Sequence, residues 1–179
     1  MKRFGLWIIP LMLFYAAGSG GADTLAKNPE NSPPAGSRSE SSVNAKLVGS
    51  WRLVSWVARQ PDSTVKHTMG ADPIGFLIYD GFGNMSVQIM DSFRPGFERG
   101  YAGTTLEELK SIHDGYLAYF ETYVIDEKQH AVVHRIKAIT NPNYYGADLV
   151  RYYELSGDRL VLSLDKDKLN SLTWARIKE

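Results

Sequence analysis

The sequence predicts an all-β domain, an eight-stranded antiparallel barrel that occupies the last three quarters of the 179-residue chain. Short segments in which apolar and polar residues alternate dominate this region, turn-forming residues separate them, and a single segment has helical spacing. Eight short antiparallel strands can close into a barrel just wide enough for one small ligand. A β-sandwich is the competing fold, because the spacing of the strands fits both.

The expected strands are bounded by residues that favour turns. Residues 80–83, Asp-Gly-Phe-Gly, are a strong hairpin signal because glycine accepts a positive φ, and residues 156–158, Ser-Gly-Asp, form a second tight turn. The eight expected strands are 51–59, 75–79, 84–90, 119–125, 130–138, 147–155, 160–164 and 172–177.

One segment between the third and fourth expected strands has the features of a helix. Thr105 and Glu108 form a capping box, in which the threonine oxygen accepts from a free backbone N–H and the glutamate reaches back to the cap. Apolar side chains follow at helical spacing, at Leu106, Leu109, Ile112 and Tyr116. The helix and the loop before it are long enough to lie across one open end of a barrel. The loop carries four side chains that we expect to form either a lid or the packing surface of the helix: Phe93, Arg94, Phe97 and Tyr101.

The N-terminal residues have the order of features found in a secretory signal peptide. Lys2 and Arg3 give a positive start, residues 4–17 are almost entirely apolar, and small residues follow up to Ala22. The apolar stretch is about 14 residues long, shorter than the ~20 that a membrane-spanning helix needs. We expect cleavage after Ala22, or after Ala17, followed by export to the periplasm or the medium with no stable membrane insertion. An uncleaved membrane anchor is the alternative.

The expected organisation is therefore a signal peptide over residues 1–22, a flexible linker over 23–45 and a β-barrel domain over 46–179. The linker is rich in serine, proline and asparagine and has almost no large apolar side chain. Such a segment cannot bury enough apolar surface to offset the entropy of ordering it.

Composition and missing motifs exclude several classes of function. The absence of cysteine excludes a lipoprotein anchor, disulfide bonds and cysteine nucleophiles. Basic and acidic residues number 20 each and form no basic run, so we expect no nucleic-acid partner. We also expect no cofactor and no metal. His130 and His134 lie four residues apart on an expected strand, so they are ~13 Å apart, too far to share a metal ion. His67 and His113 fall in an expected loop and helix and should face solvent.

Alternation along two neighbouring expected strands places polar groups on the inner face of the barrel. On the fifth strand, Arg135 and Lys137 belong outside, which leaves His134 inside among apolar residues. On the sixth strand, Leu155 packs inward and Arg151 shares its face. A slip of one residue in this register would turn Arg151 outward.

A buried arginine remains charged and needs a partner. That partner is either Glu121, on the fourth expected strand, or an acidic group on a ligand. Tyr119, Tyr123 and Tyr153 share the inner faces and would extend a polar cluster. Under the functional interpretation, these residues anchor a ligand between mostly apolar walls. Under the alternative, they form a hydrogen-bonded network that fixes the packing of a solid core.

Asn143 belongs to the connection 141–146, Asn-Pro-Asn-Tyr-Tyr-Gly, between two expected strands. Asparagine, proline and glycine each favour turns, so one interpretation is turn chemistry alone. The other places Asn143 at the mouth of the barrel, in contact with a ligand.

Short motifs stand in order across the whole domain. They are L-V-G-S-W-R-L-V-S-W (47–56), G-F-L-I-Y-D-G-F-G-N-M-S-V-Q (75–88), G-Y-L-A-Y-F-E-T-Y (115–123), V-V-H-R (132–135), N-P-N-Y-Y-G (141–146), V-R-Y-Y-E-L (150–155), G-D-R-L (157–160) and L-T-W-A-R (172–176). Together they resemble the bacterial and fungal lipocalin-like domain family. The resemblance implies a calycin-type barrel. It implies no single activity, since some fungal relatives are biosynthetic isomerases or cyclases.

The same resemblance implies structural roles for two residues. In lipocalins, the tryptophan of the G-x-W motif plugs the narrow end of the barrel and an arginine from the last strand lies across it. Trp51 and Arg176 are similar to that pair. A guanidinium on an indole face contributes ~1 kcal/mol as a cation–π contact.

Three functions follow from this sequence. The first is an exported barrel that binds a small, largely apolar molecule, with an acidic group that meets Arg151. The second is an isomerase, cyclase or hydratase on the same barrel, with His134 as general acid or base and Glu121 beside it. The third is a structural or stress-related module with a filled core.

Overall fold

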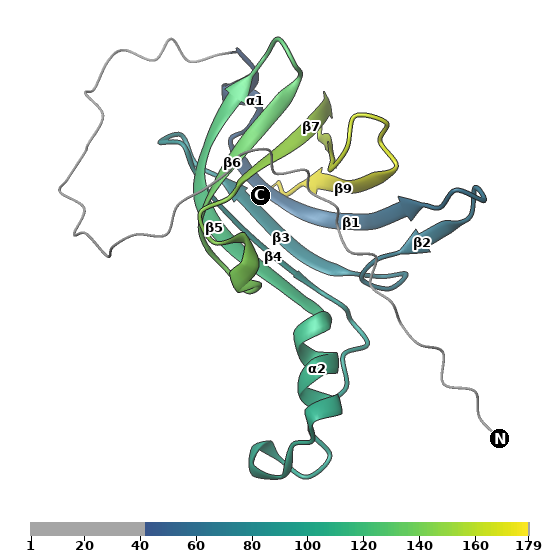
Figure 1. The fold of residues 1–179 in the computed structure, drawn as a ribbon. Helices are drawn as coiled ribbons and strands as arrows, with labels where there is room; N and C mark the ends of the chain where they lie inside the picture. The colour runs from purple at the N-terminus through teal and green to yellow at the C-terminus, as the bar shows by residue number, and fades with distance from the viewer. Residues whose placement is uncertain (1–41, 179) are drawn as a thin grey trace, which may run out of the picture. The chain divides into compact units, whose positions relative to one another are not determined.

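A closed antiparallel barrel forms the body of the domain in the computed structural model, which describes residues 42–178 (Figure 1). The chain divides into two units, Met1–Ser37 and Arg38–Glu179, and the described residues belong to the second. The strands are β1 (Gly49–Arg59), β2 (Val65–His67), β3 (Ile74–Tyr79), β4 (Asn84–Met90), β5 (Tyr116–Asp126), β6 (Ala131–Ile139), β7 (Asp148–Ser156), β8 (Arg159–Ser163) and β9 (Asn170–Arg176). Strands β3 to β9 pair in chain order, and β1 pairs with both β3 and β9, which closes the barrel.

All eight predicted strands are present, and closure of the sheet excludes the β-sandwich. The structure adds β2, which pairs only with the end of β1 and lies outside the closed ring. Three residues are too few to show alternation, so the sequence did not reveal this strand. His67 therefore belongs to a strand and not to a loop, although its side chain is exposed as expected.

The inner face of the barrel is apolar because successive side chains of a strand point to opposite faces. In β3, Gly75, Leu77 and Tyr79 are buried while the residues that alternate with them are exposed. The core contains Trp51, Leu53, Trp56, Leu77, Val87, Ile89, Val132, Leu160, Leu172 and Trp174.

One end of the barrel is closed by α1 (Ser42–Leu47) and the start of β1. The Trp51 ring is fully buried, and its Nε1 donates a 2.9 Å hydrogen bond to the carbonyl of Leu47. The helix begins at Ser42, inside the range 23–45 that we expected to be flexible; residues 1–41 lie outside the described part of the chain. Burial of Leu47 against the core gives this short helix the packing that its sequence alone does not supply.

Arg176 completes the same end from β9. The guanidinium carbon lies 4.0 Å from the centroid of the Trp51 ring, and the guanidinium donates to the carbonyls of Lys46 and Val48. Gly49 has a φ of +133°, and a Cβ at this position would lie 2.6 Å from Nη1 of Arg176. The glycine of the G-x-W motif is therefore required both by its backbone conformation and by the arginine that passes over it.

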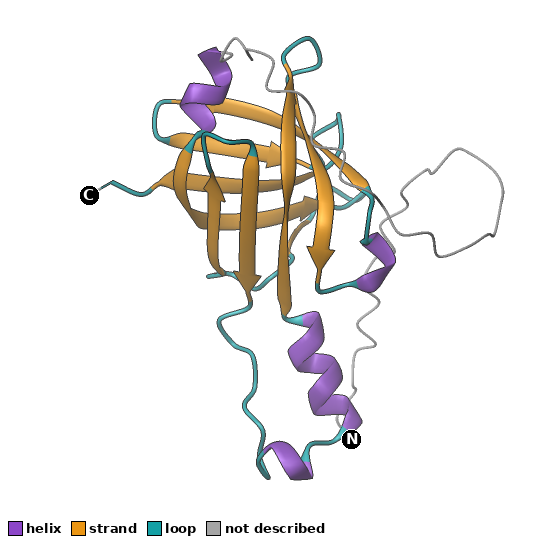
Figure 2. Ribbon diagram, turned by 90° about the vertical axis from the view of Figure 1, so that its left-hand side faces the viewer, coloured by secondary structure: helices purple, strands orange, loops and turns teal. Residues whose placement is uncertain are grey.

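The helix α2 (Leu106–Asp114) extends beyond the strands at the other end of the barrel and does not cover the opening (Figures 1 and 2). The capping box between Thr105 and Glu108 is present as predicted. The helix ends at Asp114, so Tyr116 belongs to β5 and not to the helix. None of its nine described residues is buried, so no apolar stripe of this helix packs against the barrel. No helix within residues 42–178 is long and apolar enough to span a membrane.

The loop before α2 packs on itself and on the base of β5. The rings of Phe97 and Tyr101 meet edge to face at 5.7 Å, and the guanidinium of Arg94 lies 5.3 Å from the centroid of the Tyr116 ring. Tyr101 opens a 3₁₀ turn, η1 (Tyr101–Gly103). Phe93 is 78% exposed, so the lid that we considered for this loop is not formed.

We predict that Arg176→Ala destabilises the barrel by about 1–3 kcal/mol, because it removes a cation–π contact and two hydrogen bonds to carbonyls. Urea denaturation followed by tryptophan fluorescence measures this loss. Arg159→Ala is the matched control, since Arg159 is an exposed arginine on the neighbouring strand and should cost under ~0.5 kcal/mol. Equal stability of the two variants would contradict the closing role of Arg176.

Candidate functional site

Three charged or titratable side chains from adjacent strands point into the barrel. Glu121 on β5, His134 on β6 and Arg151 on β7 have exposed fractions of 2%, 0% and 7%. The strand register brings them together, because Tyr123 of β5 pairs with His134, and Val132 of β6 pairs with Arg151. Groups of this kind are costly to bury, so the cluster marks a site where function or a specific packing requires them.

His134 lies between the carboxyl group of Glu121 and the phenol of Tyr79. Its Nδ1 lies 2.8 Å from Oε1 of Glu121, and its Nε2 lies 2.9 Å from the hydroxyl of Tyr79. The first contact is short, but the ring N–H does not point squarely at the oxygen, so proximity and charge hold this pair more than hydrogen-bond geometry does. Neither carboxyl oxygen of Glu121, nor Nδ1 of His134, has a hydrogen-bond partner of good geometry among the described residues.

Burial controls the protonation of Glu121, His134 and Tyr79. Loss of water raises the pKa of Glu121 to about 8, against the opposing charge of Arg151 and with a smaller contribution from Asp148. The loss of water, and to a smaller extent the charge of Arg151, holds the pKa of His134 well below its usual value. Burial also raises the pKa of Tyr79. At neutral pH the imidazole is therefore uncharged and the carboxyl group is largely protonated.

Arg151 does not form an ion pair with Glu121, which was one of the two partners that we considered for it. Among residues 42–178 no carboxylate lies within ion-pair distance of its guanidinium, and Glu121 contacts His134 instead. Nη1 of Arg151 donates a 3.1 Å hydrogen bond to the carbonyl of Val150. The guanidinium also interacts with Tyr119, whose pKa is raised to about 12 by burial and lowered by the arginine. A nearly buried cation is thus left without an anionic partner in the described chain.

Two of the predicted tyrosines line the inner face beside this cluster. Tyr119 is half-buried, and its ring centroid lies 6.3 Å from that of His134. Leu117 lies two residues before Tyr119, on the same face of β5 and nearer α2, and it is also half-buried. The inner face therefore becomes accessible toward the end of the barrel that bears α2. Tyr153 points inward with a 9% exposed side chain and meets the ring of His130 edge to face.

The other two predicted contacts have different roles. The hydroxyl of Tyr123 lies 2.8 Å from both Oδ1 of Asn44 and the carbonyl of Asp80, so it ties α1 to the β3–β4 hairpin. Asn143 lies in the 3₁₀ turn η2 (Pro142–Tyr144), where its side chain is exposed and its backbone N–H donates to the side chain of Asn141. Turn chemistry is therefore present at Asn143, and its contact with a ligand stays a prediction.

Tyr79 is the site residue that the sequence reasoning missed. Its inward orientation follows from the alternation with Leu77, which could have been read from the sequence. Its contact with His134 could not, because β3 and β6 are not neighbours in the sheet. That contact runs across the interior of the barrel.

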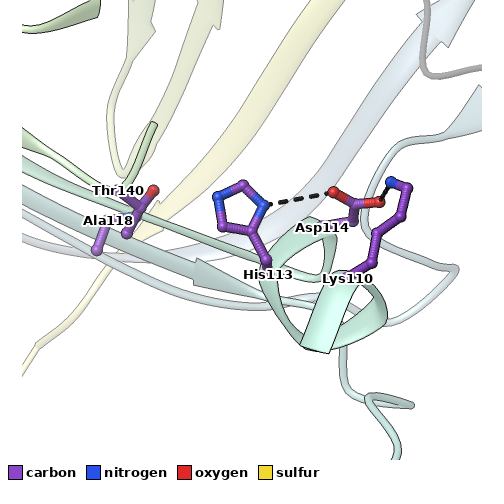
Figure 3. Close-up of polar contacts among 5 residues, drawn as sticks. All are labelled: Lys110, His113, Asp114, Ala118 and Thr140. Atoms are coloured by element: carbon purple, nitrogen blue, oxygen red, sulfur yellow. Dashed lines mark hydrogen bonds and ion pairs between the residues drawn. The ribbon is translucent and has the colours of Figure 1, made fainter. Parts of the chain in front are cut away.

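His113 lies apart from this cluster. His113 is exposed on α2, where its Nδ1 lies 3.4 Å from Oδ1 of Asp114, which also pairs with Lys110 (Figure 3). In the part of the chain that the structure describes, no group of three potential ligand residues could hold a metal ion. A hollow of about 340 Å³ lies at β3, β4 and β5, and its lining includes Ile78, Phe120 and Glu121.

A comparison with protein families agrees with this architecture. The family model described as "Lipocalin-like domain" matches residues 48–177. A search of curated proteins finds no match.

Solved structures of low sequence identity are also similar. A lipocalin-like protein from Bacteroides uniformis is 14% identical, with a TM-score of 0.43, and the alignment covers 74% of this chain and 99% of that one. An uncharacterized protein from Bacteroides eggerthii is 10% identical, with a TM-score of 0.42 and coverage of 73% and 99%. A protein from Burkholderia xenovorans is 13% identical, with a TM-score of 0.38 and coverage of 87% and 100%.

The family match spans the whole barrel, from the G-x-W segment to the last strand, and the observed closed sheet is the fold that this family implies. The chain belongs to the lipocalin-like domain family.

Proposed function

We propose that the barrel binds a small, largely apolar molecule whose acidic group meets Arg151. The observation that carries this proposal is a guanidinium, 7% exposed, with no carboxylate within ion-pair distance in residues 42–178. An arginine cannot lose its proton in a protein, so a buried one requires an anion. A ligand acid supplies that anion without burying a second charge of the protein itself.

The lining of the barrel supports an apolar body for this ligand. The side chains that surround the polar cluster on the inner face are aliphatic or aromatic, among them Leu77, Val87, Val132 and Leu149. Small-molecule sites are generally apolar cavities with a few convergent polar groups that fix orientation. The half-buried Leu117 and Tyr119 point to the end of the barrel near α2 as the route of entry.

A matched pair of ligands tests the proposal. We expect the wild-type protein to bind cis-parinaric acid, a fluorescent carboxylic acid, at least tenfold more tightly than its methyl ester at pH 7. Arg151→Gln should remove this preference, because a hydrogen bond to a charged group contributes about 1.5–3 kcal/mol, which is roughly 10- to 100-fold in affinity. Fluorescence titration of the two probes measures both quantities.

Arg135→Gln is the control for this experiment, since Arg135 is an exposed arginine on the outer face of the adjacent strand β6. It should keep the preference for the acid. An Arg151→Gln protein that folds and still prefers the acid as the wild type does would overturn the proposed role of Arg151.

We also propose that the chain is exported, on the basis of the signal-peptide pattern in residues 1–22. Intact mass measurement of the protein from its own host should give a chain that begins at Asp23, or at Gly18 if the signal is cut after Ala17. A full-length chain that remains in the cell membrane would contradict export in soluble form. Native mass spectrometry of the same sample would reveal a co-purified ligand.

A second candidate function is proton-transfer catalysis, favoured by the chain of contacts from Glu121 through His134 to Tyr79. An isomerase, cyclase or hydratase could use such a chain as its general acid or base. His134→Gln should then retain binding of substrate while turnover falls by about 10²–10⁴-fold. Absence of turnover by the wild-type protein across carbonyl-containing acids would leave binding as the function.

A further inference from the structure

We infer that the acidic group of the ligand is a carboxylate held between Arg151 and the un-ionised carboxyl group of Glu121, whose Oε2 proton it accepts. This inference rests on the proposed function and adds the chemical class of the acid and its dependence on a proton. Three observations and one chemical argument support it.

The first is an unpartnered oxygen inside the barrel. Glu121 is 2% exposed, and neither Oε1 nor Oε2 has a hydrogen-bond partner in residues 42–178, although Oε1 lies 2.8 Å from Nδ1 of His134. Buried polar atoms in native proteins almost always have a partner in the protein, in ordered water or in a ligand. Trp174, on the inner face of β9, has a buried Nε1–H that likewise has no partner in the described chain. The interior of the barrel therefore contains hydrogen-bonding groups whose partners are not among the described protein residues.

The second observation is the direction of hydrogen bonding around His134. The assignment that satisfies most groups has the hydroxyl of Tyr79 donate to Nε2, which places the ring proton on Nδ1, next to Oε1 of Glu121. Oε1 then faces this N–H at 2.8 Å, although the angle of the contact is poor, and this assignment places the acid proton of Glu121 on Oε2. The reverse assignment leaves the Tyr79 hydroxyl proton without an acceptor as well as Oε2 without a donor. Oε2 is accordingly an O–H donor that lacks an acceptor.

The third observation is the charge around this carboxyl group. The titratable groups around it are Tyr79 on β3, Tyr119 and Tyr123 on β5, His134 on β6, and Asp148 and Arg151 on β7, whereas β4, which pairs with it at Met85, carries none. Of these, only Arg151 is a cation at neutral pH. Burial nevertheless outweighs its attraction and raises the pKa of Glu121 to about 8, so the proton is present before a ligand arrives.

The fourth is the chemistry that these two groups share. A carboxylate has two oxygens, which can accept one hydrogen bond from a guanidinium and one from a carboxylic acid. Both bonds are charge-assisted, and O–H···O⁻ bonds of this type are short and strong. If Glu121 lost its proton, the ligand would face a like charge in a medium with little water. Binding of the carboxylate therefore requires the proton on Glu121.

The sign of the pH dependence follows. At pH 7 Glu121 is largely protonated in the free protein, and binding takes up almost no proton. As pH rises through about 8, the free protein loses this proton and must regain it on binding, so affinity falls. Between pH 7 and pH 9 the affinity for a carboxylate should drop about tenfold, which is the ratio of the protonated fractions for a group that titrates near pH 8.

The experiment is a titration of wild-type protein with cis-parinaric acid and with its methyl ester at pH 7 and pH 9. The acid is ionised at both pH values, since free carboxyl groups titrate near pH 4. We expect the dissociation constant of the acid to rise about tenfold and that of the ester to change less than twofold. Calorimetry of wild-type protein in two buffers of different ionisation enthalpy should show uptake of about one proton per bound acid at pH 9 and close to none at pH 7.

Two variants separate this inference from the proposed function. Glu121→Gln has an amide N–H₂ that can donate to the ligand but cannot titrate, so its affinity for the acid should be equal at pH 7 and pH 9. Glu107→Gln, an exposed change on α2, should keep the pH dependence of the wild type. Arg151→Gln should bind the acid weakly at both pH values.

The outcomes are distinct. A wild-type affinity for the acid that stays constant from pH 7 to pH 9, with no proton uptake at pH 9, overturns the inference about Glu121. This holds even if Arg151→Gln weakens binding and so supports the proposed function. Failure of Arg151→Gln to weaken binding overturns the proposed function and with it the inference. If Glu121→Gln does not fold, the proton count for the wild-type protein alone decides.

Discussion

A permanent positive charge inside an apolar barrel is the constraint on which the rest of the interior depends. Arg151 points inward because β7 alternates, and its exposed fraction of 7% leaves little water around the guanidinium. Its field acts on every titratable neighbour: it opposes ionisation of His134 and favours ionisation of Tyr119 and Glu121. The protein does not neutralise this charge with an adjacent carboxylate from residues 42–178. It keeps Glu121 beside His134, so the interior carries a net charge that a bound anion can cancel.

This arrangement also explains why the binding and catalytic interpretations share the same residues. A carboxyl group with a raised pKa, a neutral imidazole and a phenol can either orient a ligand or move a proton, depending on what the ligand presents to them. The fold does not decide between these uses, since one fold can carry unrelated functions. The chemistry of the ligand decides. Under our two proposals, an acid without an activated C–H bond would only be held, whereas one with a carbonyl beside such a bond would react.

Most of the fold could be predicted from the sequence, because local alternation and turn residues determine which face of each strand is buried. The same rule gave the inward orientation of His134 and Arg151 without knowledge of their partners. Contacts that cross the barrel could not be predicted from this alternation. The sequence could not show that Tyr79 meets His134, or that Glu121 prefers the imidazole to the guanidinium, because these contacts depend on side-chain reach in three dimensions. Short elements such as β2 and α1 were missed for another reason: packing stabilises them, and their own residues carry too little pattern.

The pairing of β1 with β9 has a consequence for how the chain acquires its structure. The contact between Val48 and Arg176 joins residues 128 positions apart. Closing the barrel therefore costs chain entropy before the contacts between β1 and β9 can stabilise it. Domains dominated by such distant contacts fold in milliseconds to seconds, more slowly than helical ones. A ribosome delivers β9 after all the other strands, and until then β1 and β8 are open edges able to pair with other chains. The barrel therefore depends on its last strand for protection against aggregation as well as for its final shape.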